Sequence, residues 1–300
     1  MSLDWEATFA AWASPPSDTE QAKCDNAERA VRNAIKASAK LKDLSIEVFT
    51  QGSYANRTNV RQESDVDICI LYTGAYYPDY SQSVELTSAM LGHKDGTYPY
   101  ATFKNDVEAA LVAFFERAGV TRGNKAFDVH ANTYRVDADV VPCFEYRRYF
   151  GPAASPNVIY GTQLNPDKGS SIINWPRQNY KNGVDKNDAT KRGFKGVVRV
   201  IKRLRNEMAD NKIAAAQPIP SYLIECLIWN TPNETLMNPN WKTDVRDAIA
   251  YLWTNTRSDE QCNAWREINQ NKYLFRDNQP WTRQSVNDFL QATWNYIGFE

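Results

Sequence analysis

Polar and apolar positions along the first part of the chain predict a helix followed by two strands. Residues 17–44 begin with the capping residues Ser17 and Asp18 and continue as an alanine-rich periodic sequence, which predicts a long helix. Residues 45–50 (SIEVFT) and 65–72 (DVDICILY) are β-branched and alternating, which predicts two strands. In the second strand, odd-numbered residues share one face and even-numbered residues share the other.

The middle of the chain continues as a mixture of helix and strand. Residues 73–100 are rich in Gly, Pro and Tyr and predict a long loop, whereas residues 102–118 have the helical period. Two short strands are expected at 126–130 and 133–141, and Pro142 should end the second strand or place it at an edge.

The last part of the chain has only helical patterns. Residues 151–161 (GPAASPNVIYG) are typical of a boundary, because Gly and Pro interrupt regular elements. Beyond them, residues 190–210 gather their apolar side chains in one stripe, and residues 221–230 and 241–297 have similar periods. The order of elements predicts an α+β fold in which a mixed sheet with flanking helices precedes a helical lobe.

Length and charge narrow the class of protein. At roughly 100–200 residues per domain, 300 residues predict one large domain or two packed ones, divided here into 1–160 and 161–300. The chain has 35 basic and 36 acidic side chains, a net charge of −1. This balance argues against a surface built to bind long double-stranded nucleic acid or a membrane.

Cysteine and histidine usage disfavours several kinds of site. The 5 Cys include no C-x-x-C pair and are odd in number, which argues against a disulfide scaffold or a zinc knuckle and favours a reducing cytoplasm. The 2 His exclude a His-rich metal site, and we assign no role to His93 or His130. The first residues (MSLDWEATF) lack a signal-peptide pattern, and the longest apolar run, 109–115, is far too short to span a membrane.

Paired carboxylates provide the first indication of chemistry. Asp65 and Asp67 begin an otherwise apolar strand and project from the same face, about 7 Å apart. Carboxylate oxygens in this arrangement suit Mg²⁺, which also binds phosphate oxygens. The later strand offers Asp137 and Asp139, and a third carboxylate from either would permit a site for two Mg²⁺ ions, with Mn²⁺ as a substitute.

Other residues fit phosphate and base binding. Gly52 and Ser53 follow a strand, where backbone N–H groups and a hydroxyl can cradle phosphates. A stripe of cations on the helix at 190–210 can offset the charge of a triphosphate, and its members are Lys195, Arg199 and Lys202.

Arg205 falls inside the apolar stripe of that helix, which predicts a paired buried side chain or an earlier end to the helix. Ser221 begins the next helix and can hold a phosphate oxygen, while Tyr222 can stack on a nucleobase.

Each feature taken alone has a simpler structural explanation. A Gly-Ser pair usually forms a turn, an Asp-x-Asp pair is usually a solvated edge, a basic helix face is usually just exposed, and a lone Tyr is more often core. Their order along one chain favours the functional interpretation, because adjacent charges beginning an apolar strand require a reason.

This order of residues resembles the DNA polymerase β-like nucleotidyltransferases. The pattern there is Gly-Ser, a spacer, an Asp-x-Asp strand and a later single acid, here Gly52-Ser53, Asp65-Val66-Asp67 and Asp139. The run Asp139–Pro142, the helix GVVRVIKRLR and the segment IPSYLIECLIWN are similar to the branch of oligoadenylate synthetase, cyclic GMP–AMP synthase and the bacterial cGAS/DncV-like enzymes.

The resemblance implies a fold and a set of roles. A nucleotidyltransferase core and a C-terminal helical lobe would enclose an active site in the cleft between them. Asp65, Asp67 and Asp139 would hold two Mg²⁺ ions, although Asp137 leaves the third ligand open. The remaining implied roles are triphosphate contact by Ser53, Lys202 and Ser221, base stacking by Tyr222, and base sensing by Asn182 in the lid-like segment 175–191.

Departures from the animal enzymes point to the compact bacterial type. The sequence lacks a zinc-binding insertion and a broad basic surface. The expected activity is synthesis of a cyclic oligonucleotide second messenger, most simply a cyclic dinucleotide, from NTPs in anti-phage signalling. The expected partners are a downstream effector, reached through the product, and a protein activator. The alternatives are transfer to an RNA 3′ end, a protein or a small molecule, and a catalytically inactive nucleotide-binding protein.

Overall fold

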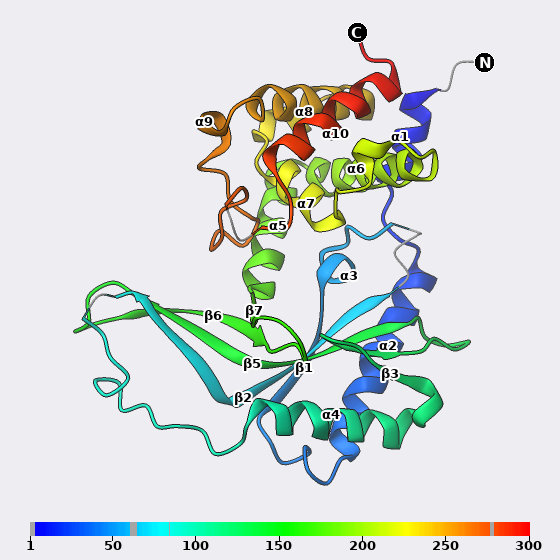
Figure 1. The fold of residues 1–300 in the computed structure, drawn as a ribbon. Helices are drawn as coiled ribbons and strands as arrows, with labels where there is room; N and C mark the ends of the chain where they lie inside the picture. Colours follow the sequence, from blue (N-terminus) through cyan, green and yellow to red (C-terminus); the bar gives the residue numbers. More distant parts are fainter. Residues whose placement is uncertain (1–3, 61–64, 84, 277–278) are drawn as a thin grey trace. The chain divides into compact units, whose positions relative to one another are not determined.

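The computed structural model describes residues 4–60, 65–83, 85–276 and 279–300, which belong to two compact units (Figure 1). The sheet unit consists of Ser17–Tyr54 and Ser64–Pro176, and the helical unit consists of Met1–Pro16, Ala55–Glu63 and Arg177–Glu300. Each unit has its own hydrophobic core. Within the described ranges, every helix is too short or too polar to cross a bilayer.

In the described part of the chain, a seven-stranded sheet organises the sheet unit. Its strands are β1 (Ile46–Gln51), β2 (Val66–Gln82), β3 (Val120–Arg122), β4 (Phe127–Val129), β5 (Ala138–Phe150), β6 (Asn157–Leu164) and β7 (Ile172–Asn174). The order is β1-β2-β5-β4-β3, with β6 paired to both β5 and β7. The central pair β2 and β5 is parallel and every other pair is antiparallel.

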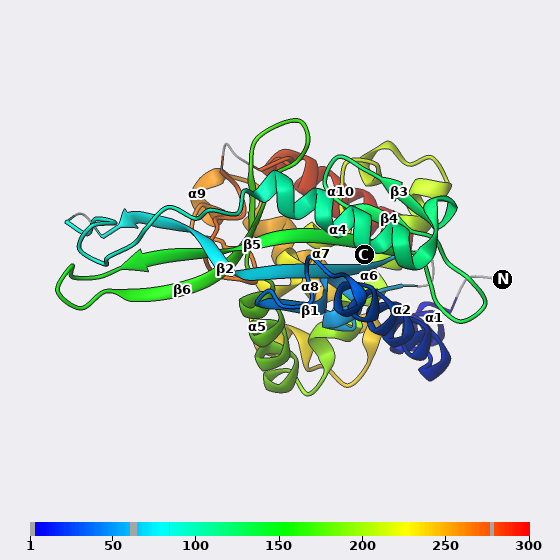
Figure 2. The ribbon, with the colours of Figure 1, turned by 90° about the horizontal axis from the view of Figure 1, so that it is seen from below.

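Helices cover one face of this sheet. The helices α2 (Asp18–Ala37) and α4 (Tyr100–Phe115) lie on the same side, and the short α3 (Gly52–Asn56) follows β1 (Figures 1 and 2). The apolar run in the first half of β2 is buried between the layers, with Ile68 and Ile70 both fully enclosed. The predicted mixture of sheet and flanking helices is therefore confirmed.

Two strands are longer than the sequence pattern indicates. β2 runs on to Gln82, so the expected loop at 73–100 begins as strand, and β2, β5 and β6 form an extended arm of the sheet (Figure 2). β5 begins only at Ala138 and passes through Pro142, which neither ends it nor places it at an edge. Pro142 is tolerated because it lies after the last β4 pair and before the first β6 pair, where no antiparallel partner requires its missing N–H.

The helical unit is built around one central helix. Its helices are α1 (Trp5–Ala13), α5 (Pro176–Ala189), α6 (Gly193–Asp210), α7 (Ser221–Trp229), α8 (Trp241–Asn255), α9 (Asp259–Cys262) and α10 (Arg283–Ile297). The apolar stripe of α6 is buried against α1, α7 and α8, as its period predicts. The helices expected throughout 241–297 are interrupted, because the described residues 263–276 and 279–282 form no helix and include a bridge between Arg266 and Tyr273.

The units differ from the predicted division at residue 160. The N-terminal helix α1 joins the helical unit, because Phe9 and Ala13 are buried in its core. The segment 55–63 also belongs there, and β6 and β7 extend the sheet beyond 160. Periodicity along the chain cannot show which unit an element belongs to, since this depends on the core that the element contacts.

Gly196 marks a close approach inside the helical core and provides a test of it. A Cβ atom at Gly196 would lie 2.3 Å from the Trp241 ring, whereas one at Gly183 in α5 would meet only Phe194 at 3.9 Å. Overpacking should therefore make Gly196→Ala about 1–3 kcal/mol less stable, despite the better helix propensity of Ala. Thermal or urea unfolding of both variants checks this: Gly183→Ala should be neutral or stabilising, and equal stability of the two would contradict the packing described.

Candidate active site

Three aspartates on neighbouring strands form a row on one face of the sheet. β2 and β5 pair with Asp67 opposite Asp139, and β4 and β5 pair with Asp128 opposite Asp139. Residues directly opposite one another point to the same face, and neighbouring strands lie about 4.8 Å apart. Asp65 precedes Asp67 by two residues, and its charge acts on Asp139. The fold thus brings the predicted acids together and adds one.

The electrostatics of this row favour a bound cation. Burial raises the pKa of Asp139, and the negative charges of Asp65 and Asp128 raise it further. As they stand, no three or more His, Cys, Asp or Glu side chains of the described residues are grouped as a metal site. Carboxylate oxygens are nevertheless the ligands that Mg²⁺ prefers, and a divalent cation would relieve their repulsion. The residues present therefore fit such an ion by donor type and by charge.

The structure favours Asp139 over Asp137 as the third acid. The Asp137 carboxylate accepts a hydrogen bond of 2.6 Å from the backbone N–H of Ala131, and its carbonyl accepts one of 3.0 Å from the N–H of Val66. Asp137 therefore holds the turn that enters β5. Asp139 is the residue that lies opposite Asp67.

Gly52 leaves space for one of the acids. It has a positive φ of 68°, and a Cβ atom there would lie 2.2 Å from Oδ2 of Asp67. Only glycine permits the chain to turn from β1 into α3 at this distance from the carboxylate. Ser53 follows in the first turn of α3 and is partly exposed.

Lys202 has a structural role that the sequence did not predict. Its side chain is fully buried in α6, and its ammonium pairs with Glu225 of α7 at 2.9 Å. Glu225 also accepts a hydrogen bond of 2.8 Å from the Thr58 hydroxyl. The contact between Lys202 and a triphosphate stays a prediction, and it would require the ammonium to leave a buried carboxylate.

Arg199 is also engaged in holding the unit together. Arg199 is 6% exposed, and its guanidinium donates to the carbonyl oxygens of Ala13 and, at 2.6 Å, of Arg57. Burial lowers its pKa to about 10, and the nearby Arg203 contributes. Arg199 thus joins the end of α1 and the described residues 55–60 to α6, and its contact with a nucleotide also stays a prediction.

Lys195 is the cation of this stripe that is best suited to an anion. It is partly exposed, and no hydrogen bond or ion pair of its ammonium is found among the described residues. Burial lowers its pKa, and the positive charges of Arg199 and Arg57 act in the same direction. An added phosphate would relieve this repulsion between cations.

The start of α7 carries the remaining predicted residues. The Ser221 hydroxyl accepts a hydrogen bond of 2.5 Å from Arg205, which explains an arginine within an apolar stripe. The hydroxyl of the partly exposed Tyr222 donates to Glu267 at 3.0 Å. The Asn182 amide donates to the carbonyl of Ile268 at 2.6 Å, so Asn182 and Tyr222 both contact the segment 267–269.

Three residues of interest escaped the sequence analysis. Asp128 lies in a strand that was predicted, but its register against Asp139 is a non-local property. Arg57 follows the Gly-Ser pair, yet its proximity to Lys195 depends on folding. Glu267 lies in a segment expected to be helical, and only its three hydrogen-bond donors distinguish it.

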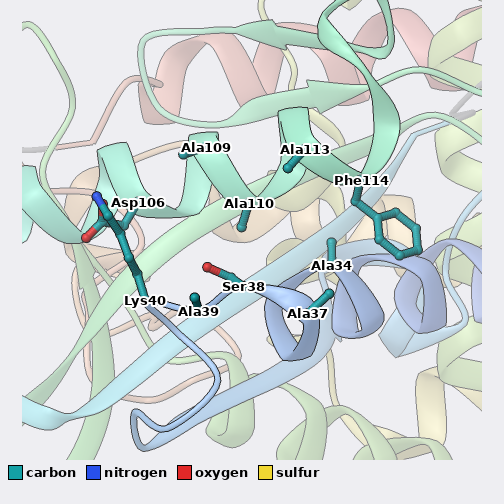
Figure 3. A pocket seen from close by; sticks show the side chains of 10 residues that line it. All are labelled: Ala34, Ala37, Ser38, Ala39, Lys40, Asp106, Ala109, Ala110, Ala113 and Phe114. Carbon is teal, nitrogen blue, oxygen red and sulfur yellow. The ribbon is translucent and has the colours of Figure 1, made fainter.

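A pocket between α2 and α4 is separate from these residues. It has a volume of about 390 Å³ and is lined mainly by alanines, with Phe114 and the ion pair of Lys40 and Asp106 at its margins (Figure 3). None of the acids in the row and none of the predicted nucleotide-binding residues lines it. It therefore has no part in the candidate site.

Two family models match the chain. The nucleotidyltransferase domain matches residues 31–117, and the cGAS/DncV-like nucleotidyltransferase C-terminal helical domain matches residues 181–298. These ranges contain Asp65, Asp67, the later part of α5 and the helices from α6 to α10.

Named relatives and solved structures extend over nearly the whole chain. A cyclic dipyrimidine nucleotide synthase CdnE of Legionella pneumophila is 46% identical and covers 99% of both chains, and one of Cecembia lonarensis is 40% identical over 98% of each. The Elizabethkingia meningoseptica CdnE cyclic dinucleotide synthase structure with GTP and Apcpp is 32% identical, with a TM-score of 0.79 over 98% of this chain and 99% of that one. The Rhodothermus marinus CdnE c-UMP-AMP synthase structure is 27% identical, with a TM-score of 0.85 over 98% and 97%.

Asp139→Asn should separate stability from cation binding. Because the folded state raises the pKa of Asp139, ionising it costs stability as the pH rises above about 3.9, the usual value for a free aspartate. Without divalent cations, the variant should therefore melt at a higher temperature than the wild type at about pH 7, and this advantage should shrink towards about pH 4. Added Mg²⁺ should stabilise only the wild type. If thermal unfolding shows that Mg²⁺ stabilises both proteins equally, Asp139 is not a ligand of the cation.

Lys202→Met and Lys195→Met form a matched pair on one helix. Removing Lys202 leaves Glu225 as an uncompensated buried charge, so unfolding should require about 3–5 kcal/mol less free energy. Removing Lys195 should leave stability unchanged and weaken nucleotide binding about tenfold, the cost of one charge-assisted hydrogen bond. Urea titration and nucleotide binding by equilibrium dialysis measure the two effects. Weaker nucleotide binding by Lys202→Met, with its stability unchanged, would instead support contact between Lys202 and the triphosphate.

Proposed function

Because the chain belongs to the cGAS/DncV-like nucleotidyltransferase family, we propose that it synthesises a cyclic dinucleotide second messenger from two nucleoside triphosphates. One observation carries this proposal: Asp67 and Asp139 lie opposite each other on paired strands, with Asp65 two residues away. The relatives that cover 98–99% of the chain at 40–46% identity are named as cyclic dinucleotide synthases, which supports the same activity here.

The proposed reaction consists of two like transfers. A ribose hydroxyl of one nucleotide attacks the α-phosphorus of the other and gives up its proton. As the new P–O bond forms, the bond from the α-phosphorus to the bridging oxygen breaks, and pyrophosphate leaves with the electron pair. A second attack within the linear product closes the ring and releases a second pyrophosphate.

The sheet unit supplies the acids for this chemistry. Asp65, Asp67 and Asp139 would hold two Mg²⁺ ions, which lower the pKa of the attacking hydroxyl and offset the charge of the triphosphate. Gly52 keeps the approach to Asp67 open, and Ser53 contributes a hydroxyl to the phosphates. Asp128 increases the negative potential that recruits cations to the row.

The helical unit supplies groups for the nucleotide. Lys195 and Ser221 bind phosphate oxygens, and Tyr222 stacks on a base. Asn182 senses the base edge with the carbonyl end of its amide, since its NH₂ group already donates to Ile268. Lys202 and Arg199 contribute indirectly by holding α6, α7 and the segment 55–63 in place.

We further propose that the bases are pyrimidines and that the product acts through an effector. The two relatives of highest identity cited above are named as dipyrimidine synthases. A small cyclic nucleotide is suited to carry a signal to a separate effector protein, here in anti-phage defence and under an activator if one exists. The five cysteines are free and buried, which supports a reducing compartment such as the cytoplasm.

A product assay tests the proposed function. The protein is incubated with all four NTPs and Mg²⁺ or Mn²⁺, the mixture is treated with phosphatase, and the surviving species are identified by mass spectrometry. We expect a phosphatase-resistant cyclic dinucleotide rich in uridine or cytidine. Asp67→Asn should lose this product by about a thousandfold or more, because the developing charge at the α-phosphate then lacks its main stabilisation.

The controls separate the alternatives. Asp43→Asn changes an exposed acid away from the row and should retain full activity. Product formation by Asp67→Asn at wild-type stability would overturn the proposal. Label that stays on RNA, a protein or a small acceptor would identify a different transferase, and Mg²⁺-NTP binding without any transfer would identify an inactive nucleotide-binding protein.

A further inference from the structure

The hydroxyl end of Tyr222 lies in a polar network that the reaction chemistry itself does not require. Its oxygen donates to Oε2 of Glu267 at 3.0 Å, accepts from the Asn269 amide at 3.2 Å and lies 3.3 Å from Oδ1 of Asn179. Burial raises the pKa of Tyr222 well above its ordinary value, and the negative charge of Glu267 contributes. The phenol therefore remains a hydrogen-bond donor throughout the physiological pH range.

Glu267 is the centre of this network. Its side chain is 4% exposed, and its carboxylate accepts hydrogen bonds from Tyr222, from Asn269 at 2.6 Å and from Gln279 at 2.7 Å. In the described part of the chain, no lysine or arginine forms an ion pair with it. A buried carboxylate balanced only by neutral donors is costly, so a purely structural role would be met more cheaply by an apolar side chain.

The network joins three elements around the Tyr222 ring. Tyr222 lies on α7, Asn179 on α5, and Glu267 and Asn269 on the non-helical segment 263–276. Asn182, one turn from Asn179, binds the same segment through the carbonyl of Ile268. Tyr222 is partly exposed while its hydroxyl is fixed, which suits a stacking platform held at a set angle.

We propose that Glu267 is a positioning residue that fixes the plane of the Tyr222 ring for base stacking. This inference rests on the proposed function, in which Tyr222 contacts a base. Glu267 acts through the phenol and touches neither the nucleotide nor the reacting phosphates. Its loss should therefore weaken nucleotide binding and leave the chemical step nearly unchanged.

A double-mutant cycle tests this role. The variants are Glu267→Gln, Tyr222→Phe and the two combined, each assayed for KM, kcat and binding of a non-hydrolysable UTP analogue. Glu267→Gln should raise KM and the dissociation constant about tenfold, as expected for loss of a hydrogen bond to a charged acceptor, with kcat changed less than about twofold. Tyr222→Phe should do the same, and the double variant should be no worse than either single one.

A second carboxylate–tyrosine pair in the same unit provides the matched control. Glu207 accepts a hydrogen bond of 2.7 Å from Tyr296, so Glu207→Gln removes the same kind of interaction elsewhere and should leave KM unchanged. If Glu267→Gln fails to fold, the binding of Tyr222→Phe tests the inference instead. This variant should fold, because Glu267 keeps its hydrogen bonds from Asn269 and Gln279.

The outcomes distinguish this inference from the proposed function. A wild type that binds the analogue but makes no cyclic product overturns the proposed function, while the binding cycle still decides the role of Glu267. An active wild type with additive effects of Glu267→Gln and Tyr222→Phe, or with unchanged binding in Tyr222→Phe, overturns the inference alone.

Discussion

The parallel pairing of β2 with β5 is the constraint on which the candidate site depends. It sets Asp67 against Asp139, and the pairing of β4 with β5 sets Asp128 beside them. Like charges at strand spacing oppose folding, and burial together with this repulsion raises the pKa of Asp139. The two strands tolerate the row because the residues that follow it, such as Ile68 and Val140, are completely buried and stabilise the sheet.

In the helical unit, by contrast, the buried cations Lys202 and Arg199 have partners that stabilise them. Lys202 is matched by Glu225, and the Arg199 guanidinium is satisfied by backbone carbonyl groups. These interactions join α6 to α1, to α7 and to residues 55–60. Of these, α1 and residues 55–60 lie far from α6 in the sequence. Lys195 differs from its two neighbours because no hydrogen bond or ion pair of its ammonium is found among the described residues, which suits it to an incoming anion.

A third arrangement surrounds Tyr222. There a carboxylate is buried without a cation and is satisfied by a phenol and two amides. Repelled acids, paired charges and a carboxylate satisfied by neutral donors thus occupy different parts of one chain. The first arrangement suits a metal ion, the second stabilises the fold, and the third holds an aromatic ring in place.

The sequence by itself determined the fold class, the family and the acids of the catalytic motif, because these depend on residue order. Gly52-Ser53, Asp65-x-Asp67 and the apolar stripe of α6 are local patterns, and short-range sterics and periodicity make them readable. Only the tertiary structure placed Asp139 rather than Asp137 opposite Asp67, added Asp128 to the row, and revealed the buried contacts of Lys202 and Arg199. Strand register, the partner of a buried charge and the unit that an element joins all depend on contacts between residues far apart in the chain, which no local pattern encodes.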